Sequence, residues 1–286
     1  MNTDDLIKKS QDENKLSQSE LTHLLSLPPD SADSYRVMAE ANRVSKELSG
    51  GYAEVHAQFA LNLAPCPGNC VFCSFAQVNG VFSEASQLEP EEAVAQAKQF
   101  EKDGVNAIFV MTTAKYPFEK FVEISQEIRL NLNPETTLIA NVGDQPADHA
   151  KKLKAVGPEH TNDEIAEMIC FTASFNPSYS GAARRIAIPN TKIAERGMIS
   201  ELRMSQIVAV TRLGMPRTVM GNCTHEPCTL GALAGANLFW AEAGANPRDV
   251  EKNTEKGRGD TVEYCKKLFY ESGWDLFAGP SRYYLN

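Results

Sequence analysis

The chain has 286 residues, of which 42% are hydrophobic and 23% are charged, and its formal net charge is −9. This length and composition are typical of a globular protein with one large domain or two small ones. The acidic balance argues against nucleic acid as the main partner, and no apolar run approaches the roughly 18 residues of a membrane span. The N-terminus also lacks the regions of a signal peptide, so we expect a cytoplasmic protein with no membrane and no nucleic-acid partner.

Residues 1–50 predict a helical cap with no chemistry of its own. Leu21, Leu24, Leu25 and Leu27 form the apolar face of a first helix, which ends at Pro28-Pro29. A second helix is expected at 33–48, closed by Gly50-Gly51. This pair of helices should pack on the bottom or side of the domain that follows.

Strands and helices alternate from Tyr52 onward. The predicted strands are 52–63, 106–111, 137–142, 184–189, 217–221 and 235–242. The predicted helices are 90–102, 118–130, 146–156, 162–175, 200–212, 227–234 and, in a polar tail, 261–272. This order predicts an α/β fold, a (βα) barrel of the TIM type, over residues 51–245, followed by a helical tail at 246–286.

The alternation fails at one place, the junction Val156-Gly157. The predicted helix 146–156 leads into Gly157-Pro-Glu-His-Thr161 and then directly into helix 162–175, with no apolar run for a strand between them. We therefore expect an incomplete barrel, or an irregular one whose gap is filled by a loop.

The segment Cys66-Pro-Gly-Asn-Cys70-Val-Phe-Cys73 directly follows the first predicted strand. Three thiolates at this spacing can bind one face of a compact metal centre, and Gly68 gives the loop the backbone freedom for a tight turn. A closed zinc site or an ordinary cubane would need a fourth ligand nearby, and the next cysteine is Cys170. The spacing favours a three-cysteine [4Fe-4S] cluster with one open iron. A zinc knuckle or a buried cysteine cluster is the alternative.

This motif resembles that of the radical S-adenosylmethionine (SAM) superfamily, in which the open iron binds the amino and carboxylate groups of SAM. The resemblance implies that Cys66, Cys70 and Cys73 are the catalytic metal ligands and that Phe72 lies against the adenine of SAM. By position it also implies that Thr112 and Thr113 contact the amino group of SAM, although both could instead cap the next helix.

The second half of the chain is similar to one branch of this superfamily. Arg212-Leu-Gly-Met-Pro216, Leu230-Gly-Ala-Leu-Ala-Gly-Ala-Asn237 and Asn246-Pro-Arg248-Asp249 resemble the C-terminal part of biotin synthase and its relatives. These relatives are the [FeFe]-hydrogenase maturase of similar build, methylornithine synthase and the archaeal lipoyl synthases. Beside them, Val156-Gly157 reads like an internal deletion of about forty residues.

The resemblance implies an oxygen-sensitive enzyme that reductively cleaves SAM and abstracts hydrogen from a small or carrier-bound metabolite. Sulfur insertion or a carbon-skeleton rearrangement would follow, and a flavodoxin or ferredoxin would supply the electron. Glu159 lies in a segment that lines the SAM site in relatives and could bind the ribose; capping of the following helix is the alternative.

The remaining candidates lie in two clusters. Cys223-Thr-His225-Glu-Pro-Cys228 could hold an auxiliary iron–sulfur cluster, the sulfur source that sulfur insertion needs, or its His225 and Glu226 could contact substrate. Arg184 or Arg185 could pair with a carboxylate of substrate or SAM, with the other a surface charge. A different class of function also stays open: a non-catalytic iron–sulfur or zinc-binding relative with a degenerate barrel.

Overall fold

A seven-stranded parallel sheet is the centre of the computed structural model, which describes residues 1–12, 15–63, 65–142, 158–254 and 259–284. Six strands follow the order β5-β4-β1-β8-β7-β6, and β9 pairs with the start of β1. Their bounds are β1 (Tyr52–Ala60), β4 (Ala107–Met111), β5 (Thr137–Asn141), β6 (Tyr179–Ala182), β7 (Gly221–Thr224), β8 (Leu238–Ala243) and β9 (Asp275–Leu276). A separate antiparallel pair joins β2 (Asn62–Leu63) to β3 (Ser86–Gln87).

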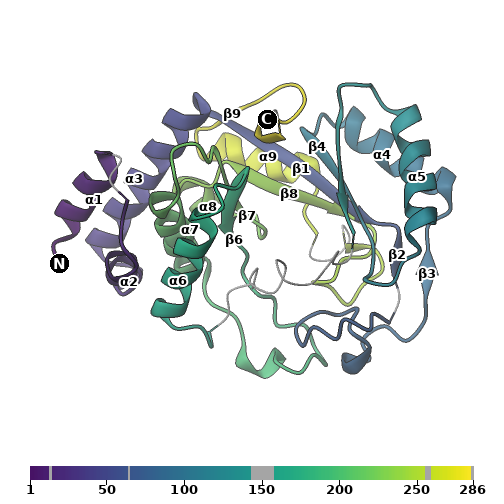
Figure 1. Cartoon of the computed structure of the whole chain (residues 1–286), viewed down its shortest axis with the longest axis horizontal. Coiled ribbons are helices and arrows are strands. Elements are labelled where there is room, and N and C mark those ends of the chain that lie inside the picture. The colour runs from purple at the N-terminus through teal and green to yellow at the C-terminus, as the bar shows by residue number, and fades with distance from the viewer. Residues whose placement is uncertain (13–14, 64, 143–157, 255–258, 285–286) are drawn as a thin grey trace.

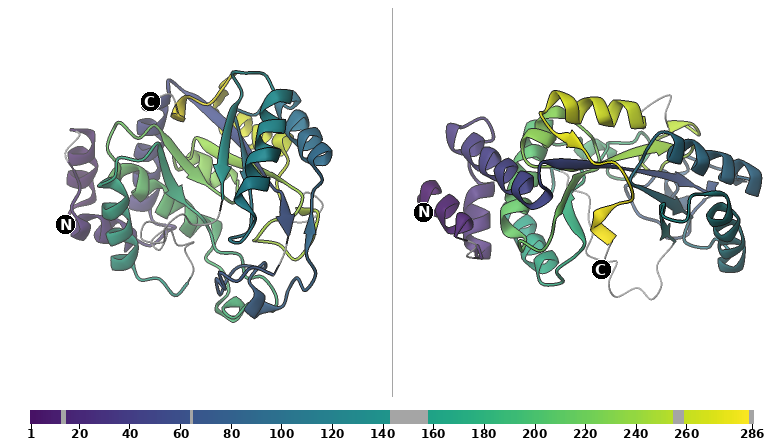
Figure 2. Two further views of the ribbon diagram at one scale, coloured as in Figure 1. Left: turned by 45° about the vertical axis from the view of Figure 1, so that its right-hand side comes forward. Right: turned by 90° about the horizontal axis from the view of Figure 1, so that it is seen from above.

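Helices surround this sheet on its outer face (Figures 1 and 2). They are α1 (Thr3–Gln11), α2 (Gln18–Leu25), α3 (Ala32–Ser49), α4 (Pro90–Lys102), α5 (Phe118–Asn131), α6 (Asn162–Ala173), α7 (Glu201–Gly214), α8 (Thr229–Leu233) and α9 (Val262–Glu271). Over the residues that the structure describes, none of these helices is long and apolar enough to cross a membrane.

The sheet is an incomplete barrel. Its first and last barrel strands, β1 and β8, pair in parallel as they do in a closed barrel, with Glu54 beside Leu238 and Phe59 beside Ala243. The third and fourth strands in chain order, β5 and β6, are the two edges of the described sheet. A full TIM barrel has eight strands. The predicted (βα) barrel of incomplete form is therefore confirmed, and its open seam lies between β5 and β6.

The sequence discontinuity at Val156-Gly157 falls between these two edge strands. Residues 143–157, with the predicted helix 146–156, lie outside the described part of the chain. In the sequence, the two edge strands are therefore separated by the stretch where the strand–helix alternation fails.

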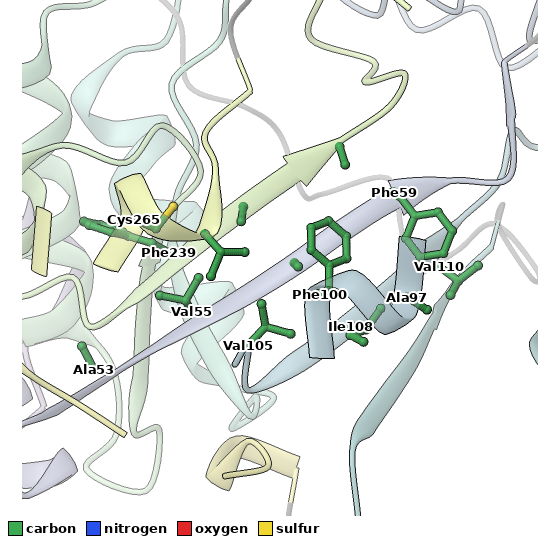
Figure 3. Close-up of a cluster of buried hydrophobic side chains, with 14 of the residues drawn as sticks. Ala53, Val55, Phe59, Ala97, Phe100, Val105, Ile108, Val110, Phe239 and Cys265 are labelled. Atoms are coloured by element: carbon green, nitrogen blue, oxygen red, sulfur yellow. The ribbon is translucent and has the colours of Figure 1, made fainter. Parts of the chain in front are cut away.

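Strand β1 organises the core because its two faces differ in chemistry. Ala53, Val55 and Phe59 point outward and pack in one cluster with residues of α4, β4 and α9, and Figure 3 shows Phe59 beside Phe100. The intervening residues Glu54, His56 and Gln58 point into the barrel, where each is 5% exposed or less. Both faces of β1 are thus buried, and only the inner one is polar.

The N-terminal helices form the predicted cap, with one helix more than expected. Leu21, Leu24 and Leu25 of α2 are fully buried in a second apolar core that α2 and α3 share with α6 and α7. Local signals fix the helix ends: Ser17 and Glu20 form a capping box, and Gly50 ends α3 at φ +65°. Helix α1 was not resolved as a separate element in the sequence because its only large apolar residues are Leu6 and Ile7.

Two predicted strands are wrong in position. The strand expected at 184–189 is instead β6, five residues earlier, and the strand expected at 217–221 is instead β7, which begins at Gly221. Residues 216–219 form a turn in which the Val219 N–H donates to the Pro216 carbonyl at 3.1 Å. The β-branched pair Thr218-Val219 is typical of a strand but lies in this turn.

The C-terminal tail is tied to the sheet along most of its length. Helix α9 packs on β8, and the Trp274 indole N–H donates to the Ala232 carbonyl at 3.1 Å. The chain then pairs as β9 with β1 and ends in a 3₁₀ turn, Arg282–Tyr284, whose Tyr283 is 2% exposed. The domain boundaries expected near residues 50 and 245 stay predictions.

Gly235 joins α8 to β8 in a conformation that only glycine adopts without strain, which makes it a test of this fold. Its φ is +95°, and an added Cβ would lie 2.7 Å from the Ala41 carbonyl oxygen of α3. We expect Gly235→Ala to lower the free energy of unfolding by about 2–5 kcal/mol, from the left-handed backbone and the overlap together. Urea unfolding of the apoprotein measures this.

The matched control is Gly51→Ala, because Gly51 also has a positive φ of +85° but no atom within 4 Å of an added Cβ. It should cost only the backbone strain, about 1–2 kcal/mol. Equal losses in the two variants would show that the close approach of α3 to Gly235 does not exist in solution.

Candidate metal centre and barrel interior

The cysteine loop lies at the carboxyl end of β1, beyond β2, where catalytic loops lie in (βα) barrels. It folds back on itself through backbone hydrogen bonds. The Cys66 N–H donates to the Phe75 carbonyl at 2.6 Å, the Gln77 N–H to the Cys66 carbonyl at 3.0 Å, and the Cys73 N–H to the Cys70 carbonyl at 3.0 Å. These bonds hold all three cysteines on one compact loop.

The three thiols affect one another electrostatically. Burial, with smaller contributions from negative charge on Cys70 and Cys66, raises the pKa of Cys73 to about 11. Cys66 and Cys73 are half-buried and Cys70 is exposed. Three soft thiolate ligands on one loop fit three corners of an iron–sulfur cubane. The described residues contain no His, Cys, Asp or Glu trio already in metal-binding arrangement, so the thiols would have to reorient on binding.

Asn79 supports the cysteine loop, a role that no sequence pattern indicates. Its side-chain amide donates to the Cys73 carbonyl at 2.9 Å and lies 3.4 Å from the carbonyls of Cys70 and Val71. Its side-chain oxygen accepts from the Lys192 N–H at 3.2 Å. The long loop between β6 and α7 therefore docks on the cysteine loop through Asn79, and Figure 1 shows both loops along the lower edge of the molecule.

Phe72, Thr112 and Thr113 lie near this end of the barrel. Phe72 is 36% exposed, and Thr113 is hydrogen bonded to both side-chain atoms of Asn62, at 2.8 and 2.9 Å. The Thr112 N–H donates to the Asn141 carbonyl and continues the ladder between β4 and β5. Neither threonine caps α5, whose N-cap is Pro117, so that alternative is wrong. Contacts of all three residues with SAM stay a prediction.

Glu159 forms an ion pair with Arg185 and does not cap a helix. Thr161 is the N-cap of α6, so the capping role considered for Glu159 is wrong. Its carboxylate accepts from the Arg185 guanidinium at 2.9 Å. Burial alone would raise the pKa of Glu159, but hydrogen bonds to its own backbone N–H and to Arg185 outweigh burial and lower that pKa.

Arg184 and Arg185 follow β6 in the loop to α7, not within a strand. Arg185 is 3% exposed and bound to Glu159. Arg184 is half-buried, its guanidinium lies 3.8 Å from Glu201, and its backbone N–H donates to Glu226 at 2.7 Å. The expectation that one of the pair is a surface charge is therefore wrong. Binding of SAM or substrate by Arg184 stays a prediction.

A polar network spans the barrel interior beside the cysteine loop. We call Gln58, Glu226, Glu242 and Arg248 the acidic layer. The Arg248 guanidinium donates to both carboxylates, and the Gln58 amide donates to Glu242. The side chains of Glu242 and Glu226 are only 4% and 13% exposed. Two carboxylates share one cation, so this layer carries a net negative charge.

Direct contacts join the acidic layer to the cysteine loop. The Ser74 N–H donates to the Pro247 carbonyl at 3.0 Å, and the Ser74 hydroxyl donates to the Asn246 carbonyl at 3.3 Å. Arg248 follows these residues immediately. The sequence offered one signal for this arrangement: Gln58 and Glu242 each lie between apolar residues of strands that are otherwise fully apolar at this end. The sequence alone does not indicate which distant residues Gln58 and Glu242 contact.

Aromatic rings fill the barrel on the other side of the acidic layer. The rings of His56, Phe109, Tyr179, Trp240 and Tyr284 lie 4.4–6.2 Å apart, in chains of neighbouring pairs. His225 stacks flat on Trp240 at 5.0 Å. Burial, with a smaller effect from Arg248, lowers the pKa of His225 to about 3, so its imidazole is neutral at physiological pH. We call these six side chains, the five rings and His225, the aromatic floor.

Cys223 and Cys228 occupy different packing environments. Cys223 is buried with Leu238 and Tyr283, whereas the Cys228 sulfur caps α8 by accepting from the Gly231 N–H at 3.3 Å. Burial raises the pKa of both thiols, to about 12 for Cys223. Within the described ranges nothing assembles a third ligand around them. An auxiliary cluster at these residues stays a prediction without support from this geometry.

The fold and the site define a class of (βα) proteins, parallel half-barrels with a three-cysteine loop at the carboxyl ends of the strands. Comparison with known proteins narrows that class. Residues 65–190 match the radical SAM superfamily. Biotin synthase of Corynebacterium glutamicum strain R is 24% identical over 188 residues, which cover 64% of this chain and 54% of that protein. Biotin synthase of Mycolicibacterium paratuberculosis is 24% identical over 152 residues, covering 52% and 44%. The chain thus spans about half the length of the curated relatives that it matches.

Solved structures show the same fold. Methylornithine synthase superposes with a TM-score of 0.69 at 14% identity, covering 97% of this chain and 98% of that one. The [FeFe]-hydrogenase maturase HydG from Carboxydothermus hydrogenoformans superposes with a TM-score of 0.66 at 18% identity, covering 94% and 78%. The chain is therefore similar to the radical SAM superfamily over residues 65–190 and to biotin synthases, and the radical SAM superfamily implies a [4Fe-4S] cluster and SAM.

Proposed function

We propose that the chain is a cytoplasmic radical SAM enzyme that abstracts hydrogen from a small or carrier-bound metabolite inside its half-barrel. The observation that carries this proposal is the position of the cysteine loop, which Ser74 joins to the acidic layer at the carboxyl end of the strands. Cys66, Cys70 and Cys73 would hold the [4Fe-4S] cluster. When bound and reduced by a flavodoxin or ferredoxin, the cluster and SAM would supply a 5′-deoxyadenosyl radical.

The chain's own residues would hold, orient and shield the reactants. Asn79 holds the cysteine loop and joins it to the loop that follows β6. Phe72, Thr112, Thr113, Glu159 and Arg184 are the proposed SAM contacts. The acidic layer would orient substrate, because Glu226 and Glu242 are held rigidly by Arg248. Exclusion of water protects a radical intermediate from side reactions.

Two outcomes of hydrogen abstraction remain proposals, sulfur insertion and rearrangement. Sulfur insertion would need a second cluster as a sulfur source. The separate environments of Cys223 and Cys228 favour rearrangement over sulfur insertion.

The deciding experiment is anaerobic. The protein is reconstituted with iron and sulfide, its iron is counted, and SAM with dithionite is added. About four irons per chain and formation of 5′-deoxyadenosine support the proposal, and about eight irons would indicate a second cluster. Zinc in place of iron would contradict it.

A non-catalytic iron–sulfur relative is the second candidate, and the open seam between β5 and β6 favours it. Such a protein would bind iron but would neither bind nor cleave SAM. Calorimetric titration of the reconstituted protein with SAM therefore separates the two candidates.

A further inference from the structure

A cavity of about 770 Å³ lies between α6 and β6 at the open seam. Its volume falls in the range of small-molecule sites, about 300–1,000 Å³. In a closed barrel, the edge of β6 that faces away from β7 would pair with another strand of the sheet. Here it is lined instead by the inward face of α6, including Ile165, Met168 and Ile169. The cavity is thus a product of the incomplete barrel.

The inner wall of the cavity belongs to the barrel interior already described. Tyr179, Cys223, His225 and Tyr284 line it, and His225 and the two tyrosines are parts of the aromatic floor. The His225 carbonyl accepts from the Arg248 guanidinium at 3.0 Å. A molecule in the cavity therefore lies one residue from the acidic layer, which itself adjoins the cysteine loop.

The wall chemistry selects an uncharged occupant. Burial holds His225 neutral and keeps the thiol of Cys223 and the phenol of Tyr179 protonated at physiological pH. The carboxylates that line the cavity, Glu164 and Glu167, lie on α6 at exposed positions. An anion would meet Glu167 at the entrance and the net negative charge of the acidic layer at the inner end, and the described residues that line the cavity include no Lys or Arg. Apolar surface and neutral polar groups remain for binding.

We propose that this cavity binds an uncharged aliphatic chain of the substrate, which enters through the seam between α6 and β6 and presents its inner end to the acidic layer. This inference rests on the proposed function and deepens it, because it names the substrate class. The substrate would be elongated, with an alkyl segment in the cavity and a neutral or cationic polar group at Glu226 and Glu242.

The test uses reconstituted, SAM-loaded protein and a series of n-alkyl amides from butanamide to decanamide. Anaerobic calorimetry should show saturable binding whose affinity rises with chain length until the cavity is filled. Decanoate should bind at least tenfold more weakly than decanamide, because its carboxylate would meet the net negative charge of the acidic layer at the inner end of the cavity. Absence of saturable binding, or equal affinity for decanoate, would overturn the proposal.

Two variants that fill the cavity localise the binding. Met168→Trp on α6 and Ala183→Phe after β6 change lining residues, and each should weaken decanamide binding at least tenfold. The control is Leu130→Trp on α5, where the side chain is 81% exposed and should bind like the wild type. Circular dichroism and iron content confirm folding for each variant, and wild-type affinity in both cavity variants would refute the site.

Failure of this inference is distinguishable from failure of the proposed function. Amide binding without 5′-deoxyadenosine formation would support the cavity and contradict the enzyme. Deoxyadenosine formation without amide binding would support the enzyme and refute the cavity as the aliphatic site.

Discussion

Serine in place of Cys66, Cys70 or Cys73, one at a time, is expected to reduce iron from about four to below one per chain after anaerobic reconstitution. Formation of 5′-deoxyadenosine from SAM and dithionite should fall at least a hundredfold in each variant. The reason is that each substitution removes one of the three protein ligands. A cubane held by the two remaining thiolates has no protein ligand at two of its four irons. Iron analysis and chromatography of the nucleoside products measure both effects.

Cys170→Ser is the matched control, because Cys170 is also half-buried but lies on α6, outside the cysteine loop. It should keep the iron content and SAM cleavage of the wild type. Full iron in any of the three loop variants would remove that cysteine from the ligand set, and equal losses in Cys170→Ser would point to general instability.

Arg248→Met should produce the second large effect. It removes the one cation of the acidic layer and leaves the carboxylates of Glu226 and Glu242 buried without a counter-charge. Because an unpaired buried carboxylate is strongly unfavourable, we expect the free energy of unfolding to fall by about 2–4 kcal/mol, the lower range reflecting partial exposure of Arg248. The rate of 5′-deoxyadenosine formation should fall at least tenfold, since Arg248 follows the residues that contact Ser74.

A second arginine provides the control. Arg282 is 22% exposed against 24% for Arg248, and it pairs with the buried carboxylate of Glu54, in the N-terminal half of β1. Arg282→Met should lower stability comparably and leave SAM cleavage per folded, iron-loaded chain within twofold of the wild type. If both variants lose cleavage equally, the acidic layer acts through stability alone.

The unpaired charge can itself be tested by adding Glu242→Gln to Arg248→Met. A neutral amide in place of one stranded carboxylate should recover part of the lost stability, because the cost lies in the charge left behind. No recovery in the double variant would show that Arg248 contributes through packing of its side chain.

Much of the fold was readable because its signals are local. The alternating pattern of β1, the capping residues of α2 and α6 and the Pro90 start of α4 each act within a few residues of the element they define. The cysteine loop was readable for the same reason, since its spacing lies within eight residues. Even the discontinuity at Val156-Gly157 was visible, as a missing strand signal between two edges of the sheet.

What could not be read depends on contacts between distant residues. Strand β6 is Tyr-Ser-Gly-Ala, which has no apolar run, and it exists because it pairs with β7 so closely that a Cβ on Gly181 would lie 2.0 Å from the Cys223 carbonyl. The acidic layer joins β1, the end of β7, β8 and the loop after β8. Gln58 and Glu242 are 184 residues apart, and no local rule pairs them.

The pairing of β1 with β8 bears on the order in which the protein is made and assembled. Strand β1 pairs with β8, which is synthesised about two hundred residues later. Asn246 and Pro247, whose carbonyls accept hydrogen bonds from Ser74 beside the cysteine loop, follow β8 in the chain. Long-range parallel pairing is slow to form. The contacts of Ser74 with Asn246 and Pro247 can therefore form only after β8 has been synthesised, although the cysteine loop itself is made much earlier.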